Sequence, residues 1–160
     1  MEEFQARRLV DTYADRILRI SYQYLKHTHD AEDICQTVFL KYLTSAPKFD
    51  SIEHEKAWII RTTINACKDI LKSAHRRRTV PLEDASYLAA PTVADQGLLE
   101  AMQQLPEQYR ICLYLHYYEG YSAREIGSLL GKGEANVTMT LSRARKKLRT
   151  LLEAERRQIV

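Results

Sequence analysis

The sequence of 160 residues predicts an all-α protein made of two small helical units. Glycine and proline, the residues that most often interrupt helices, number only five and four. Apolar residues recur at spacings of three and four over long stretches, which is the period of an amphipathic helix. Alternating apolar and polar runs, which indicate half-buried strands, do not occur. The 45% content of hydrophobic residues fits a folded protein. The formal net charge of +3 does not indicate which class of partner the protein binds.

The first half of the chain contains three stretches with a helical period, which we expect to form helices over residues 4–25, 30–43 and about 55–74. In the first stretch one face carries the apolar residues Leu9, Tyr13, Ile17, Ile20 and Tyr24. In the second stretch the apolar stripe consists of Ile34, Val38 and Tyr42. Pro47 lies between the second and third stretches, so we expect residues 45–52 to form a loop.

Charge is distributed along the chain in blocks. Residues 79–107 contain no Lys or Arg, whereas residues 56–78 and 142–157 each contain seven of them. We therefore interpret residues 79–95 as an acidic linker between a unit over residues 1–78 and a unit over residues 96–160. The two basic blocks fit surfaces that attract a phosphate backbone, and they fit two solvated helix faces equally well.

The second half contains a short apolar helix, a glycine break and a basic helix. Ser122 and Glu125 are spaced as a capping box, in which each side chain bonds the backbone N–H of the other residue. Gly131 and Gly133 end this helix, because glycine readily adopts the left-handed conformation of a C-cap. A second helix is expected from about Glu134, with a buried stripe and an opposite face of polar and basic residues. The expected stripe is Val137, Leu141, Ala144 and Leu148, and the expected opposite face is Asn136, Thr140, Arg143 and Lys147.

This arrangement favours a DNA-binding helix-turn-helix, in which polar side chains at the start of the second helix enter the major groove and later bases meet phosphates. An αα-hairpin with a basic surface is the alternative. The segment from Leu105 to Leu148, with its LP, EG, SAREI and SRARKKL pieces, resembles region 4 of bacterial sigma-70-family factors. DAEDICQTVFLKYL, residues 30–43, resembles region 2.2 of the same family, and AWIIRTTINACKDILKSAHRR, residues 57–77, resembles regions 2.3 and 2.4. The short length points to the extracytoplasmic-function (ECF) group.

The resemblance implies a factor whose first unit binds the clamp helices of core RNA polymerase and opens the −10 element. Its second unit would read the −35 element and bind the polymerase flap. The residues that match the polymerase-binding positions are Asp33, Gln36, Thr37 and Leu40. Those that match the −10 region are Arg61, Asn65, Lys68, Lys72 and Arg76. Those of the −35 recognition helix are Glu134, Asn136, Thr138, Thr140, Arg143, Arg145, Lys146 and Lys147.

Three further expectations follow from the resemblance. Residues 45–54 match the loop in which such factors capture a flipped −10 base, although the pocket residues are not identifiable from the sequence. The acidic linker matches the segment that threads the RNA exit path of the polymerase. A partner anti-sigma protein, commonly membrane-anchored, is also implied. The chain departs from the family pattern at Gly133, where Ser or Thr is common, and at Thr138 and Thr140, where basic residues are frequent.

Several classes of protein are disfavoured by the sequence. The five His and three Cys residues show no metal-ligand spacing, and no P-loop, GxSxG or HExxH motif occurs, so we expect neither an enzyme nor a bound cofactor or metal. No apolar run approaches the roughly 20 residues of a membrane span, so we expect a cytoplasmic protein without direct membrane insertion. The remaining alternatives are an autonomous helix-turn-helix regulator, which would bind DNA without polymerase, and a pure interaction module such as an anti-sigma mimic.

Overall fold

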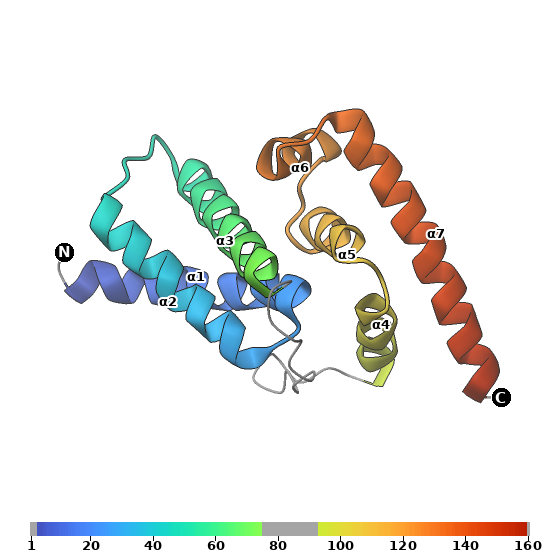
Figure 1. Cartoon of the computed structure of the whole chain (residues 1–160). Coiled ribbons are helices and arrows are strands. Elements are labelled where there is room, and N and C mark those ends of the chain that lie inside the picture. The colour runs from blue at the N-terminus through green and yellow to red at the C-terminus, as the bar shows by residue number, and fades with distance from the viewer. Residues whose placement is uncertain (1–2, 75–92, 160) are drawn as a thin grey trace. The chain divides into compact units, whose positions relative to one another are not determined.

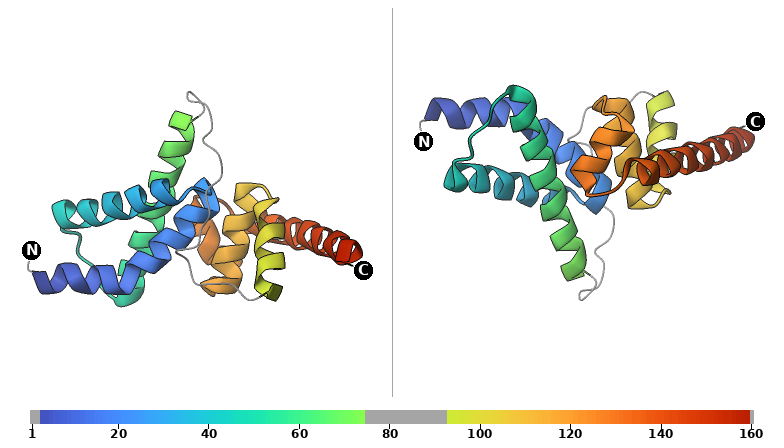
Figure 2. Two further views of the ribbon diagram at one scale, coloured as in Figure 1. Left: turned by 90° about the horizontal axis from the view of Figure 1, so that it is seen from below. Right: turned by 90° about the horizontal axis from the view of Figure 1, so that it is seen from above.

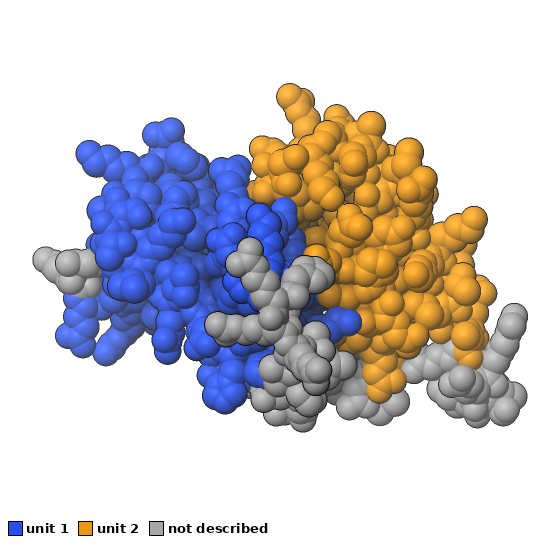
Figure 3. Space-filling model, viewed as in Figure 1, with its two compact units in different colours: residues 1–88 blue, residues 89–160 orange. Residues whose placement is uncertain are grey.

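Every element in the two ranges that this computed structural model describes, residues 3–74 and 93–159, is a helix (Figure 1). The elements are α1 (Glu3–Leu25), α2 (Thr28–Ser45), α3 (Ile52–Ala74), α4 (Val93–Gln103), α5 (Glu107–Leu113), the π-helical turn η1 (Tyr114–Tyr118), α6 (Ala123–Leu130) and α7 (Glu134–Ile159). The chain divides into two compact units, Met1–Leu88 and Ala89–Val160 (Figure 3). The predicted all-α class is confirmed.

The described part of the first unit, residues 3–74, consists of three helices, in which α1 packs against both α2 and α3 and α3 crosses them at a steep angle (Figure 2). The stripe predicted on α1 is buried, as is the stripe predicted on α2. The side chains that are at most 2% exposed in this core include Leu9, Tyr13, Ile17 and Ile20 of α1, Ile34 and Val38 of α2, and Ile59, Ile60 and Ile64 of α3. Because these faces are buried against one another, the opposite faces of α2 and α3 remain available to partners.

Both α2 and α3 begin earlier than their apolar patterns predict. The side chain of His27 caps α2, so this helix starts two residues before the expected position. The Ser51 hydroxyl accepts a hydrogen bond from the backbone N–H of His54 over 3.1 Å, and α3 accordingly starts at Ile52. The loop expected over residues 45–52 is therefore shortened at both ends, and it leaves α2 through Ala46, which has a left-handed φ of 44°.

The second unit is organised around the long helix α7, which packs against α4, α5 and α6. Its core includes Leu105, Ile111, Leu115, Ile126, Val137 and Ala144, each at most 2% exposed. Arg110 is buried as well, and its guanidinium donates a hydrogen bond to the Leu105 carbonyl, which joins α5 to the segment before it. Helix α4 begins at Val93, within the stretch interpreted as the acidic linker, and residues 79–92 of that stretch lie outside the described residues.

Candidate nucleic-acid interface

The turn between α6 and α7 contains the predicted capping box and C-cap. The Ser122 hydroxyl accepts from the Glu125 N–H over 3.2 Å, and the Glu125 carboxylate accepts from the Ser122 N–H over 3.0 Å. Gly131 ends α6 with a φ of 69°. A second glycine is equally important: a Cβ on Gly127 would lie 2.4 Å from the carbonyl oxygen of Lys132. The sequence does not show why Gly127 must lack a Cβ. The reason is the close approach of the Lys132 backbone to α6 after the turn, which exists only in the folded chain.

Helix α7 buries most of its predicted stripe: Val137, Leu141 and Ala144 are buried, and Leu148 is half-buried. The predicted −35 residues that are exposed are Glu134, Asn136, Thr138, Arg143, Arg145, Lys146 and Lys147. Thr140 is half-buried, and its hydroxyl donates to the carbonyl of Asn136 over 2.9 Å. Nearly the whole predicted set is therefore exposed along α7, whereas the Thr140 hydroxyl bonds the backbone of its own helix.

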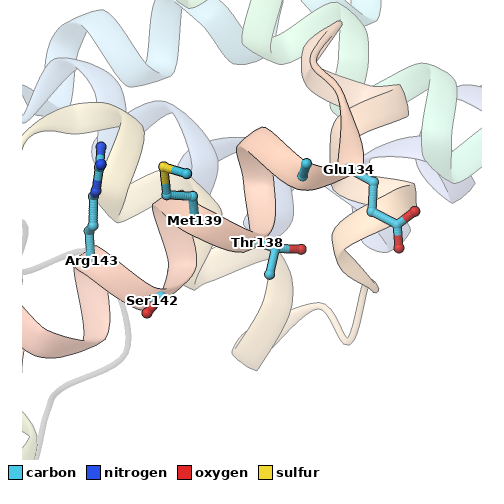
Figure 4. Close-up of a pocket in the computed structure, with 6 residues that line it drawn as sticks. Glu134, Thr138, Met139, Ser142 and Arg143 are labelled. Atoms are coloured by element: carbon cyan, nitrogen blue, oxygen red, sulfur yellow. The ribbon is translucent and has the colours of Figure 1, made fainter.

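The centre of the exposed face of α7 differs from the expected one. A helix turns by about 100° per residue, so residues 135, 139 and 142 lie opposite the buried stripe, whereas residues 136 and 140 lie at its side. Ala135, Met139 and Ser142 are exposed, and Met139 is 53% exposed. These residues line a shallow hollow together with Glu134, Thr138 and Arg143 (Figure 4). The phase of the buried stripe already implies this rotation, so the expectation that Asn136 and Thr140 lie opposite the stripe was wrong.

The later turns of α7 carry the basic residues. Arg143, Arg145, Lys146 and Lys147 are all exposed. The Arg145 guanidinium donates to the hydroxyl of Tyr117, which lies in η1 and is 61% exposed, over 3.0 Å. This bond holds one of the cations beside η1, and local patterns do not predict it because the two residues are 28 positions apart. Exposed cations on one helix suit contact with phosphate oxygens.

Helix α3 presents the residues that match the −10 region. Arg61, Asn65 and Lys72 are exposed and Lys68 is half-buried. Their spacings of four, three and four place them on one side of the helix. Arg76 lies outside the described residues. The side opposite these residues includes Ile59 and Thr63, which are buried in the core, so the polar side is held outward by packing.

Helix α2 presents the residues that match the polymerase-binding positions. Asp33, Gln36, Thr37 and Leu40 are all exposed, and Leu40 is 63% exposed. The Thr37 hydroxyl donates to the Asp33 carbonyl over 2.9 Å. A leucine exposed to this degree among polar neighbours is an apolar contact point that a partner could cover.

The loop before α3 forms a second hollow, which is lined by Phe49, Asp50, Ser51, Ile52 and Glu55. An aromatic cluster supports it from one side. Trp58 packs edge-on against Tyr42, with ring centroids 5.6 Å apart, and against Phe49, with centroids 6.0 Å apart. Trp58 is half-buried within this cluster, as expected for a packed aromatic residue.

Glu55 of α3, which also lines this hollow, binds side chains from α1 and α2. Its carboxylate accepts two hydrogen bonds from Arg8, at 3.0 and 3.1 Å, one from the Tyr13 hydroxyl at 2.6 Å and one from the Tyr42 hydroxyl at 2.7 Å. Glu55 is only 6% exposed. Nothing in the sequence marked this residue, because an acid in the first turn of a helix is ordinary and its partners are distant along the chain.

The hydrogen bonds to Glu55 determine its protonation state. Burial by itself would raise the pKa of the Glu55 carboxyl, but the bonds from Arg8, Tyr13 and Tyr42 outweigh burial and lower the pKa to about 2. Burial and the bond to this carboxylate raise the pKa of both tyrosines. The cluster therefore contains an ionised carboxylate and two protonated phenols at neutral pH.

Residues 3–74 and 93–159 contain neither a candidate metal site nor a candidate membrane span. No three or more His, Cys, Asp and Glu side chains in these ranges are grouped so as to hold a metal ion. None of the helices there combines the length and the apolar character that crossing a membrane requires.

Comparison with known proteins identifies the family. Two family models match the chain, Sigma-70 region 2 over residues 9–77 and Sigma-70 region 4 over residues 95–148. The chain is also 32% identical to the RNA polymerase sigma factor CarQ of Myxococcus xanthus, in an alignment that covers 76% of this chain and 74% of CarQ. The chain belongs to the sigma-70 family. In this sigma factor, the region 2 match includes the exposed faces of α2 and α3, and the region 4 match includes the helix-turn-helix of α6 and α7.

Other relatives place the sigma factor in the ECF group. It is 32% identical to the ECF RNA polymerase sigma factor SigE of Mycolicibacterium smegmatis, over 90% of this chain and 60% of SigE. It is 26% identical to the ECF RNA polymerase sigma factor SigW of Bacillus subtilis, over 90% of this chain and 87% of SigW. The fold is shared with the sigma factor RpoE of Bartonella quintana, which was crystallised with the anti-sigma factor NepR. That comparison has a TM-score of 0.75 at 18% identity and covers 92% of this chain and 96% of RpoE.

Proposed function

We propose that this sigma factor binds core RNA polymerase and directs it to promoters through contacts with a −10 and a −35 element. The observation that carries the proposal is the exposed face of α2, where Leu40 stands 63% exposed among Asp33, Gln36 and Thr37. A regulator that binds its operator without polymerase does not need an exposed apolar anchor on a second helical unit. An apolar anchor within a polar surrounding is typical of a protein–protein contact.

The DNA contacts are assigned to one helix of each unit. We propose that α7 enters the major groove of the −35 element, with its first turns toward the base edges and Arg143, Arg145, Lys146 and Lys147 toward the phosphates. The exposed side of α3, formed by Arg61, Asn65, Lys68 and Lys72, would contact the −10 region. The polar and basic character of both faces supports this assignment.

The hollow before α3 is a suitable place for an unpaired base of the −10 element. It lies in the loop that the family resemblance assigns to base capture, and its lining offers an aromatic ring on Phe49 and polar groups on Asp50 and Ser51. Stacking on an aromatic ring offsets part of the cost of extruding a base, which is a few kcal/mol. The Glu55 cluster would keep the floor of this hollow rigid, because it fixes the start of α3 to both other helices.

The remaining expectations are also proposals. We propose a non-enzymatic factor that acts in the cytoplasm and needs no cofactor. The structure of RpoE, the neighbour in fold, contains an anti-sigma factor, and we infer a partner of this class for the present chain. The stretch of residues 79–92, which contains acids and no Lys or Arg, would suit the RNA exit path of the polymerase.

Run-off transcription from a promoter library tests the proposal. The library is transcribed by bacterial core polymerase from more than one host, with and without this protein. Promoter-specific transcripts that require the protein are expected, and their sequences define the −10 and −35 elements. If the protein instead bound a defined DNA site by itself and neither bound core polymerase nor changed its transcripts, it would be an autonomous regulator.

A substitution on α2 tests the polymerase contact separately. We expect Leu40→Ala to weaken binding to core polymerase by about fivefold or more, because truncating a central apolar anchor costs over about 1 kcal/mol. Val10→Ala is the matched control, since Val10 is an apolar residue of α1 that is 47% exposed. Affinity is measured by fluorescence anisotropy with labelled sigma factor. Equal losses in the two variants would contradict the assignment of the α2 face.

A further inference from the structure

The first turns of α7 are uncharged apart from one acid, although the helix as a whole is basic. Residues 134–142 contain no Lys or Arg, and the basic residues begin at Arg143. At the centre of this uncharged part stands Met139, which is 53% exposed and lies directly opposite the buried stripe. Ala135 and Thr138 flank it and line the same shallow hollow (Figure 4). The outward side of the first turns of the candidate recognition helix therefore has an apolar residue at its centre.

In the major groove, one base presents an apolar group that an exposed apolar side chain can contact. Guanine, cytosine and adenine present hydrogen-bonding groups at their base edges, whereas thymine also presents its C5-methyl group. Arg, Lys, Asn and Gln, which read guanine and adenine, are missing from positions 135, 138, 139 and 142. Methionine is long, flexible and polarizable, so it conforms well to a methyl group in a groove.

We propose that Met139, with Ala135 and the methyl group of Thr138 beside it, determines sequence specificity by contacting thymine C5-methyl groups in the −35 element. The proposal rests on the proposed function and adds to it the base that this helix prefers. The charge pattern supports this orientation. If the cations from Arg143 onward lie against phosphates, the uncharged turns before them lie over the base edges.

The experiment begins with the −35 element that the run-off assay identifies, bound by this chain of 160 residues together with core polymerase. Each thymine of this element, on both strands, is replaced by uracil, which removes only the C5-methyl group. At one or two positions we expect the wild-type complex to bind about threefold to fourfold more weakly, which is the effect of losing one buried methyl contact.

The same templates are then bound by complexes that contain Met139→Ala. This variant should retain the fold, because Met139 is exposed and alanine is a better helix former. We expect it to bind the thymine template more weakly than the wild type does and to be insensitive to uracil at the positions found above. Met139→Leu should retain the sensitivity to uracil. Lys146→Ala, which removes a proposed phosphate contact, should weaken binding to both templates by the same factor.

The outcomes separate this inference from the function on which it rests. If the protein promotes no specific transcription, the sigma proposal fails before any uracil is introduced. If specific transcription is found but the −35 element has no thymine on either strand, the methyl-contact inference is overturned. It is also overturned if uracil has no effect on the wild type, or the same effect on Met139→Ala.

Discussion

The two units of this sigma factor hold their proposed DNA-binding helices in different ways. In the first unit, α3 is fixed by a buried carboxylate, Glu55, that bonds Arg8 and Tyr13 of α1 and Tyr42 of α2. In the second unit, α7 is fixed by a backbone turn in which Gly127 and Gly131 allow a close return of the chain. One arrangement depends on charge and hydrogen bonds between distant side chains, and the other on backbone space and conformation within a few residues.

This difference determines how each unit should respond to change. A buried carboxylate with hydrogen bonds from three side chains is sensitive to the loss of its charge, whether by substitution or by protonation. A glycine turn is indifferent to pH but intolerant of a Cβ where the backbone passes closely. The single tryptophan, Trp58, lies in the first unit, so its fluorescence reports unfolding of that unit while circular dichroism reports both.

The largest effect is expected from Glu55→Gln. The substitution leaves Arg8 without its carboxylate and weakens the bonds from both tyrosines, so we expect the free energy of unfolding of the first unit to fall by about 3 kcal/mol. This loss is at the lower end of the range for breaking a buried ion pair, because the Arg8 side chain is 36% exposed. Urea denaturation followed by Trp58 fluorescence measures it.

Glu53→Gln is the matched control for that variant. Glu53 lies in the same first turn of α3 and is exposed, so its loss removes only a favourable interaction with the helix dipole, under about 1 kcal/mol. Comparable destabilisation by the two variants would show that the Glu55 cluster contributes no more than a surface charge does.

Acidification should remove nearly as much stability from the first unit. The pKa of Glu55 is about 2 in the folded state against an ordinary value of 4.5. The folded state therefore binds fewer protons, and the stability that Glu55 contributes is complete above pH 4.5 and is lost as the pH falls towards 2. The loss amounts to about 3 kcal/mol. We expect the free energies of unfolding of wild type and Glu55→Gln, measured by urea denaturation, to converge as the pH falls through this range. A constant difference between the two proteins would exclude the lowered pKa of Glu55.

Gly127→Ala should destabilise the second unit by about 1–3 kcal/mol, because the new Cβ would meet the Lys132 carbonyl oxygen and displace the start of α7. The thermal transition is followed by circular dichroism, and the Trp58 transition should stay unchanged. Ser128→Ala, at the adjacent exposed position of α6, is the control and should have little effect. If both variants melted like the wild type, the close approach at Gly127 would not matter for the turn.

The smallest effect is expected from Gly133→Ser. Gly133 precedes α7, its carbonyl accepts a hydrogen bond from the Val137 N–H over 3.1 Å, and a Cβ there would meet open space. A serine hydroxyl can accept from an N–H of the first turn, so we expect a gain of a few tenths of a kcal/mol in the stability of the second unit. A loss measured by the same thermal transition would mean that the helix start cannot accommodate the serine cap.

Much of the candidate interface was predictable because it depends on periodicity and local capping. The stripe of α1 was confirmed, as was the capping box at Ser122 and Glu125. The exposure of the candidate residues of α2 follows from the same periodicity, because a helix that buries Ile34, Val38 and Tyr42 must turn its other side outward. Their contacts with polymerase and DNA remain predictions.

The sequence alone determined the helical class, the family and the position of the turn before α7, since each depends on residues within a few turns of one another. Only the tertiary structure revealed the Glu55 cluster, whose members lie up to 47 positions apart, and the close approach at Gly127. Burial of Val137 and Ala144 confirmed the rotation of α7 that its apolar stripe implied, with Met139 53% exposed on the opposite side. Local patterns specify helices, whereas distances between side chains that are remote along the chain exist only after the helices pack.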